Sequence, residues 1–128
     1  MPPTPRFTLA SLVIDCQDAH ALAEFYGRLL GWEVRASEPD WVHLRSPDGA
    51  FGLSFQGEPE YEPPLWPEEP GAQQKMLHLD IRVDDLGPAV RHAVSLGATE
   101  TSARGQDDLR VLLDPAGHPF CLFLVSPE

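Results

Sequence analysis

The stretch that decides the fold is residues 76–85, MLHLDIRVDD. Four aliphatic residues alternate in it with other side chains, most of them polar: Leu77, Leu79, Ile81 and Val83 against Met76, His78, Asp80 and Arg82. Successive side chains of a strand point to opposite faces, so this stretch predicts a strand with an aliphatic and a polar face. The aliphatic face is expected to lie under a helix. The polar face is either solvated or the floor of a ligand cavity.

A helix is predicted directly after this strand, which we place at residues 75–83. Asp84 or Asp85 can cap the helix, and Gly97 can end it. Between them, apolar residues recur at helical spacing: Leu86, Ala89, Val90, Ala93 and Val94. The helix is therefore expected over residues 85–96.

The first part of the chain predicts the same order of elements. Residues 7–16 alternate as a strand, Asp18 caps a helix, and Gly31 ends it after an apolar stripe of Leu22, Phe25, Tyr26, Leu29 and Leu30. Three short strands are expected at 32–36, 41–45 and 51–56, the last two joined by the turn SPDG at 46–49. This is a βαβββ unit.

The second part repeats the unit, with strands expected near 98–101, at 109–113 and at 120–125. Gly97 corresponds to Gly31 at an offset of 66 residues, and Gly117 corresponds to Gly49 at an offset of 68. Each unit alone would leave one face of a small sheet bare. We therefore expect one α+β domain over residues 1–128, built from two tandem βαβββ modules, 7–56 and 75–126, whose polar faces surround a shared trough.

Residues 57–74 are expected to be a linker between the modules, because they combine several prolines and glutamates with no periodicity and no basic residue. This polar segment also contains two large aromatic residues, Tyr61 and Trp66. Large aromatic residues in such a segment usually attach it to the body of the protein, and more rarely form the lid of a pocket. Both alternatives stay open for these two side chains.

Length and composition exclude several classes of protein. A chain of 128 residues suffices for one core, and a formal charge of −11 excludes nucleic acid as a partner while favouring a cationic one. Cys16 and Cys121 lie in apolar strands, so buried reduced thiols are expected rather than a disulfide. No stretch is apolar enough for a signal peptide or a membrane span. A cytoplasmic protein without a membrane partner is expected.

Three groups of motifs resemble the vicinal oxygen chelate superfamily of glyoxalase I, extradiol dioxygenases, and fosfomycin- and bleomycin-resistance proteins. They are AEFY and LLGW at 23–26 and 29–32, HLDI and VDDL at 78–81 and 83–86, and DPAGHPF at 114–120. They are similar to its glyoxalase-like subgroup. The resemblance implies a glyoxalase-type curved sheet and a homodimer, with modules paired within one chain or exchanged between two. It does not imply a particular reaction.

The resemblance also implies where a metal would bind, because metal enzymes of the superfamily take ligands from the first and fourth strands of each module. Counted from the helix starts and the turns, those positions are Ser11, Leu53, His78 and Cys121. Leu53 offers no donor, and His78 with Cys121 is one ligand short of a usual catalytic zinc site unless Asp80 or Asp15 contributes. We therefore expect no catalytic metal and no cofactor.

A small-molecule site remains the expectation for the trough. Its apolar wall is predicted to contain Phe51, Leu53, Phe55, Cys121 and Phe123, and its polar side Ser11, Asp15, His78, Asp80 and Arg82. Trp32 and Trp41 can stack on a flat or cationic ligand, although Trp32 directly follows a helix terminator and can equally belong to the core. Asp80 and Arg82 can equally pair with each other.

Three functions are compatible with this pattern. The first is a binding protein that sequesters a cationic or aromatic compound, as the resemblance to bleomycin-resistance proteins implies. The alternative is a lyase, isomerase or dioxygenase with an atypical metal site or with metal-free acid/base chemistry by His78 and Asp80. The third is an interaction protein that keeps the fold only for dimerisation.

Overall fold

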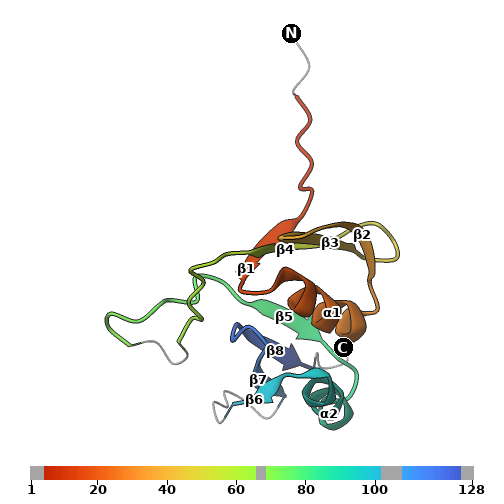
Figure 1. The fold of residues 1–128 in the computed structure, drawn as a ribbon. Helices are drawn as coiled ribbons and strands as arrows, with labels where there is room; N and C mark the ends of the chain where they lie inside the picture. The colour runs from red at the N-terminus through yellow and green to blue at the C-terminus, as the bar shows by residue number, and fades with distance from the viewer. Residues whose placement is uncertain (1–4, 66–68, 102–107, 125–128) are drawn as a thin grey trace.

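The computed structural model describes residues 5–65, 69–101 and 108–124, and its elements follow the expected order (Figure 1). The first module contains β1 (Leu12–Cys16), α1 (Ala19–Leu30), β2 (Glu33–Glu38), β3 (Trp41–Arg45) and β4 (Gly52–Gly57). The second contains β5 (Leu79–Arg82), α2 (Leu86–Leu96), β6 (Thr99–Glu100), β7 (Leu109–Leu113) and β8 (Pro119–Phe123). The two-module α+β architecture is confirmed.

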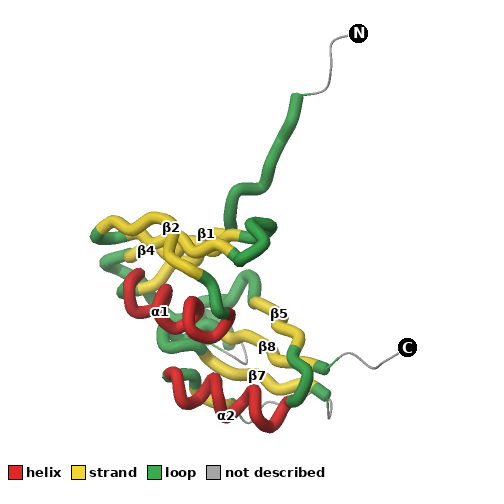
Figure 2. Tube along the Cα trace, turned by 90° about the vertical axis from the view of Figure 1, so that its right-hand side faces the viewer, coloured by secondary structure: helices red, strands yellow, loops and turns green. Residues whose placement is uncertain are grey.

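Each module forms its own four-stranded mixed sheet. The strand orders are β1-β4-β3-β2 and β5-β8-β7-β6, with the first pair of each sheet parallel and the others antiparallel. Among the described residues, no strand of one sheet contacts a strand of the other, whereas α1 contacts α2. In Figures 1 and 2, α1 lies between the first sheet and α2. Within the described part of the chain, the two sheets are therefore joined through their helices and not through a pair of strands.

Helix α1 has the ends that the sequence predicts and carries the core that joins the modules. Asp18 Oδ1 accepts hydrogen bonds from the backbone amides of His20 and Ala21, each at 3.1 Å, and Gly31 adopts a left-handed φ of 72°. The buried ring of Tyr26 stacks on Phe55 at 5.6 Å and meets Phe120 edge-on at 6.2 Å. One apolar core thus spans both sheets.

Helix α2 is capped less well than α1 at its N-terminus. Asp85 occupies the N-cap position, but its side chain makes no capping hydrogen bond, and Gly97 ends the helix with a φ of 124°. Of its residues, Leu86 and Ala93 are buried. None of the described helices has the length and hydropathy that crossing a bilayer requires.

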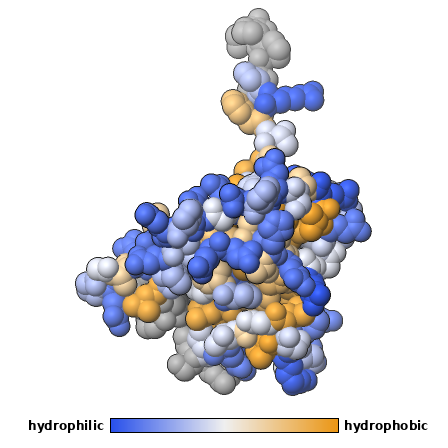
Figure 3. Space-filling model, viewed as in Figure 1, coloured by the Kyte–Doolittle hydropathy of each residue, from blue (hydrophilic) through white to orange (hydrophobic). Residues whose placement is uncertain are grey.

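The strand expected at residues 7–16 begins only at Leu12. Residues 5–9 form an arm that stands clear of the body (Figure 3), on which Phe7 is 91% and Leu9 87% exposed. An isolated extended segment gains no ladder hydrogen bonds, so alternation alone does not make it a strand. Strand β5 likewise begins at Leu79 rather than residue 75, after Met76 with a positive φ of 58°.

The linker is attached to the second module through Tyr61, whose hydroxyl donates to the Ala116 carbonyl at 2.9 Å. Leu65 also donates its amide hydrogen to the Gln73 carbonyl at 2.9 Å, which closes the linker into a loop. Tyr61 therefore pins the linker to the body, and it also lines a cavity that is described below. Trp66 lies outside the described residues.

Candidate functional site

The polar face of the second sheet brings together His78, Asp80 and Cys121. His78 Nε2 lies 3.2 Å from Asp80 Oδ1, and one possible ligand atom from each of the three residues lies within 4.8 Å of the others. Parallel pairing of β5 with β8 sets Asp80 beside Cys121, and Arg82 beside Phe123. These predicted site residues thus share one face. The side chain of His78 is 37% exposed and that of Asp80 63%, so solutes can reach the group.

Cys121 is held as a thiol. Burial raises the pKa of its thiol, and the negative charge of Asp80 and a hydrogen bond to Asp80 raise it further. A bound metal would have to displace this proton, because the thiolate is the ligand form.

The donor set fits zinc better than a hard cation. An imidazole, a thiolate and a carboxylate supply the three protein ligands of a catalytic zinc site, whereas Mg²⁺ and Mn²⁺ prefer oxygen ligands. Asp80 therefore stands close enough to complete the set that the sequence left one ligand short. Among the described residues, no side chain of the first module adds a fourth donor to His78, Asp80 and Cys121.

A second polar group lies on the first sheet and was only partly predicted. Ser54 Oγ, fully buried, lies 3.0 Å from Ser11 Oγ and 2.8 Å from His43 Nδ1. Trp41 stacks on the ring of His43 at 5.9 Å with an interplanar angle of 7°. Burial lowers the pKa of His43, and the charge of Arg45 lowers it further, which favours the neutral ring.

Sequence reasoning missed Ser54 because the turn before β4 differs in length from the turn before β8. Ser54 pairs with Val13, two residues after Ser11, and Cys121 pairs with Asp80, two residues after His78. Ser54 rather than Leu53 is therefore the counterpart of Cys121. It stands five residues after Gly49, whereas Cys121 stands four after Gly117. Counting from the strand pairing instead of the turn glycine would have found it.

The predicted apolar wall of the first module is wrong for two residues. Leu53 and Phe55 alternate with Ser54, so they point to the opposite face, where both are buried under α1. Phe51 precedes β4 and is 68% exposed, while Trp32 packs against the core beside Gly31. Phe123, half-buried, and Trp41 remain beside the polar groups. Ser11 lies with Ser54 and not with His78.

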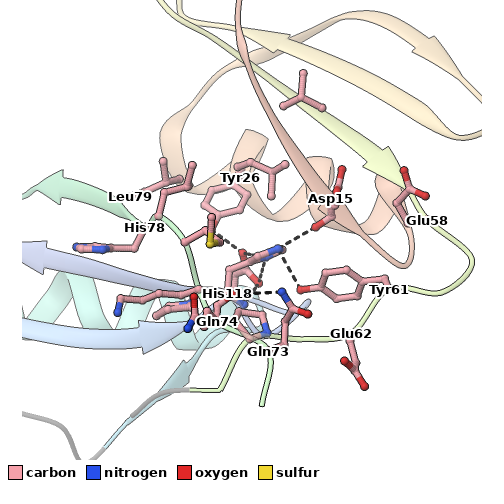
Figure 4. A pocket seen from close by; sticks show the side chains of 18 of the residues that line it. Asp15, Tyr26, Glu58, Tyr61, Glu62, Gln73, Gln74, His78, Leu79 and His118 are labelled. Carbon is pink, nitrogen blue, oxygen red and sulfur yellow. Dashed lines mark hydrogen bonds and ion pairs between the residues drawn. The ribbon is translucent and has the colours of Figure 1, made fainter. Parts of the chain in front are cut away.

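A cavity of about 450 Å³ lies between the modules, beneath the linker (Figure 4). Its walls come from the end of β1, from Tyr26 of α1, from the linker, from the start of β5 and from the turn before β8. Of the predicted site residues, His78 and Asp15 line it. This cavity was not expected from the sequence, because its walls come from segments that no local pattern connects.

One hydrogen-bond network closes the inner side of this cavity. Buried Asp114 accepts from the Tyr26 hydroxyl at 2.7 Å and lies 2.9 Å from His118 Nδ1. His118 Nε2 lies 2.8 Å from the Asp15 carbonyl oxygen and 3.0 Å from the Tyr61 hydroxyl (Figure 4). The network ties β1, α1 and the linker to the second module, so His118 has a structural role here.

The phenols of this network stay protonated. Burial raises the pKa of Tyr26 well above its ordinary value, and the charge of Asp114 and the hydrogen bond to it act in the same direction. Burial likewise raises the pKa of Tyr61, again with help from Asp114. Both hydroxyls are therefore hydrogen-bond donors at neutral pH.

Comparison with known proteins identifies the family. The family model described as a glyoxalase-like domain matches residues 11–123. No match was found among curated proteins.

Several solved structures share the fold. A glyoxalase/bleomycin resistance protein/dioxygenase family enzyme from Burkholderia phytofirmans PsJN has a TM-score of 0.68 at 23% identity, covering 91% of this chain and 98% of its own. A glyoxalase family protein from Enterococcus faecalis has a TM-score of 0.65 at 21% identity, covering 91% and 96%. TnmS3, an antibiotic binding protein from Streptomyces sp. CB03234, has a TM-score of 0.63 at 16% identity, covering 97% and 100%. With the family match over most of its length, the chain belongs to the glyoxalase-like domain family of the vicinal oxygen chelate superfamily.

Proposed function

We propose that the protein binds a small organic molecule at the polar faces of its sheets, without a catalytic metal. The observation that supports this best is the convergence of His78, Asp80 and Cys121 on one accessible face. Val111 and Phe123 flank Cys121 on the same face and add apolar surface. A few placed polar groups within apolar surroundings are typical of small-molecule sites.

A homodimer would complete this site. Strands β1 and β5 are edge strands, and no strand of either sheet contacts the other sheet among the described residues. If β1 of one copy lies beside β5 of a second, the Ser54 group of one chain faces the His78 group of the other. Two apolar side chains that are exposed next to these edges, Phe7 and Leu9, would be covered in such an assembly.

The ligand that we propose is cationic or aromatic. Trp41 and His43 offer stacked rings on the first sheet, and the net charge of −11 attracts cations. The antibiotic-binding function in the name of TnmS3 supports sequestration as the role. Unpaired, buried Cys16 and Cys121 suit the reducing cytoplasm, where we propose that the protein acts.

A thermal-shift screen of aromatic cations, neutral aromatics and anions tests the proposal, because a ligand of the native state raises the melting temperature. A compound that stabilises the wild type should stabilise the Asp80→Asn and Phe123→Ala variants less. Asp40→Asn, which removes an exposed carboxylate of the β2–β3 turn, is the matched control and should respond like the wild type. Screening without a single hit, or a screen in which every hit shifts Asp80→Asn as much as the wild type, would refute the proposal.

A second candidate function is that of a metal-dependent lyase, isomerase or dioxygenase, and the three-donor group favours it. Protein purified without a chelating tag would then hold about one zinc ion per chain, as expected for a three-ligand site. His78→Ala and Cys121→Ser would remove it. With Co²⁺ in place of zinc, a thiolate-to-metal absorption band would report Cys121 directly. A stoichiometric ion with these properties would replace the metal-free proposal.

Metal-free acid/base catalysis would use His78 and Asp80. The 3.2 Å approach of His78 Nε2 to Asp80 Oδ1 orients the imidazole for proton transfer. This variant of the enzyme hypothesis predicts turnover that resists chelators and that Asp80→Asn abolishes.

A further inference from the structure

The cavity beneath the linker differs in place and lining from the polar faces. Asp80, Cys121 and Ser54 do not line it, and His78 is the one member of those groups that does. We propose that this cavity is a second binding site, for an organic amine with an apolar body. This goes beyond the proposed function, because it assigns a different place and a specific chemical class of ligand.

The cavity is held open by hydrogen bonds at its rim. The Glu58 amide donates to the Cys16 carbonyl at 2.8 Å, where the linker leaves β4. The Tyr61 hydroxyl donates to the Ala116 carbonyl at 2.9 Å, and the Leu65 amide donates to the Gln73 carbonyl at 2.9 Å. Contacts spread along the linker therefore fix the rim before any ligand arrives. A preformed cavity of about 450 Å³ lies within the size range of small-molecule sites.

One wall of the cavity is apolar. It is lined by side chains from β1, from the start of β5 and the residues just before it, and from the start of β8: Val13, Ile14, Leu77, Leu79 and Pro119. Met76 and Leu77 are 82% and 52% exposed and Val13 is 47% exposed, so a ligand would remove apolar surface from water there. Burial of such surface is favourable, and it requires a ligand with an apolar body.

The polar side of the cavity offers acceptors. The donors at its inner end are already used, since Tyr26 donates to Asp114 and His118 contacts Asp114 and the Asp15 carbonyl. The lining carboxylates are those of Asp15, Glu58, Glu60 and Glu62. Within the described part of the chain, Asp15, Glu60 and Glu62 have no side-chain hydrogen bond or ion pair, while Glu58 accepts one from Gln56. Lys75, also in the lining, already has an interaction of its own.

A ligand that carries hydrogen-bond donors and a positive charge fits these carboxylates. An ammonium group supplies three donors to carboxylates of the rim, and a charge of −11 on the protein favours its approach. The ring of Tyr61 stands on the same side of the cavity and can face the cation or the flat part of the ligand (Figure 4). An anion would meet uncompensated carboxylates, and a neutral compound would leave them unused.

Isothermal titration with three indoles of matched shape tests the charge requirement: tryptamine, neutral tryptophol and indole-3-acetate. Tryptamine should bind at least roughly tenfold more tightly than tryptophol, and indole-3-acetate should not bind. Raising sodium chloride to about 200 mM should weaken tryptamine binding, because salt screens exposed charges. Equal affinity for tryptamine and tryptophol, or no binding of tryptamine, would overturn the proposal.

Variants locate the site. The double variant Glu60→Gln and Glu62→Gln should weaken tryptamine binding roughly tenfold or more. Glu33→Gln with Glu38→Gln, which removes two exposed carboxylates of β2 outside the cavity, should bind tryptamine like the wild type. Equal weakening in both double variants would show a general charge effect and overturn the proposal.

Asp80→Asn separates this site from the polar face of the second sheet. It should leave in place the tryptamine binding that depends on Glu60 and Glu62, whatever the outcome of the screen for the polar faces. If Asp80→Asn abolishes tryptamine binding and the Glu60/Glu62 variant does not, the amine sits on the polar face. In that case the cavity proposal fails while the proposed function gains support.

Discussion

The hydroxyl of Tyr26 in α1 donates a hydrogen bond of 2.7 Å to Asp114 Oδ2, in the turn before β8, across 88 positions of sequence. Tyr26 is 1% and Asp114 4% exposed. Asp114 Oδ1 also accepts from the backbone amides of Ala116 and His118. A buried carboxylate is costly unless its acceptors are satisfied, so this hydrogen bond stabilises the contact of the first module with the second.

Replacing Tyr26 by Phe removes one donor from the buried carboxylate and changes little else in shape. We expect the free energy of unfolding to fall by about 1–3 kcal/mol, as for a buried polar group that loses its partner. Urea denaturation followed by circular dichroism measures this. Ser95→Ala removes a hydrogen bond on the exposed side of α2 and should cost no more than about 0.5 kcal/mol. Equal losses in the two variants would contradict the role of Tyr26.

The two phenylalanines of the β4 region should behave differently. Phe55 is fully buried and stacked on Tyr26, so Phe55→Ala should cost about 3–5 kcal/mol of stability. Phe51 is 68% exposed, so Phe51→Ala should cost no more than about 0.5 kcal/mol. Chemical denaturation of both variants compares them directly. A stable Phe55→Ala protein that loses only ligand binding would restore Phe55 to the binding surface.

Local patterns in the sequence predicted the elements well because their causes are local. Asp18 and Gly31 mark the ends of α1 through capping and a left-handed backbone, and the alternation around Asp80 placed His78 and Asp80 on one face, where the structure also has Cys121. The error at Leu53 shows the limit of counting. A slip of one residue in a strand moves every side chain to the other face, and one extra residue in a turn was enough.

The relation between the modules could not be predicted from local patterns. It depends on contacts between segments far apart in the chain, such as the edge-on contact of Tyr26 with Phe120 and the packing of α1 on α2. The sequence alternation that makes each sheet amphipathic is equally compatible with sheets that face each other and with sheets held apart by a helix. The cavity beneath the linker follows from this arrangement and has no sequence signature of its own.

The neighbourhood of Cys121 predicts how its thiol reacts. Because burial and Asp80 raise its pKa, alkylation by iodoacetamide at pH 8 should be slower than that of free cysteine. Asp80→Asn removes a negative charge, lowers the pKa and should speed the reaction. Cys16, fully buried and with a pKa raised to about 11, should stay unmodified in the native protein. Peptide mass spectrometry resolves both sites, and a slower reaction in Asp80→Asn would contradict the electrostatic coupling.

His43 predicts a loss of stability in acid. Its pKa in the folded chain is lowered by burial and by Arg45 from the model-peptide value of 6.5. Below about pH 6.5 the unfolded chain binds a proton that the folded chain still excludes, so stability falls with pH until the folded pKa is passed. Melting temperatures of the wild type and His43→Gln between pH 7.5 and 5 test this. The wild type should lose more stability on acidification, and parallel curves would show that His43 does not contribute.

Substitutions at two glycines with a positive φ, Gly31 and Gly117, distinguish the cost of backbone strain from the cost of a clash with the linker. Gly31, with φ 72°, has nothing within 4 Å of an added Cβ, so Gly31→Ala should cost only the left-handed backbone penalty of about 1–2 kcal/mol. Gly117, with φ 92°, would place a Cβ 2.9 Å from Pro63 Cβ of the linker. Gly117→Ala should therefore cost more than Gly31→Ala in chemical denaturation.

A double-mutant cycle tests whether contact with Pro63 causes the additional loss of stability in Gly117→Ala. Pro63→Gly removes the opposing Cβ. In a chain that carries Pro63→Gly, Gly117→Ala should therefore cost about as much stability as Gly31→Ala. This result corresponds to a coupling of roughly 0.5–3 kcal/mol between the two touching residues. The same substitution combined with Gly31→Ala should be additive, because nothing approaches that position. Additivity at Gly117 as well would mean that the linker does not rest on the turn before β8 in solution, and the rim of the cavity would then not be fixed in advance.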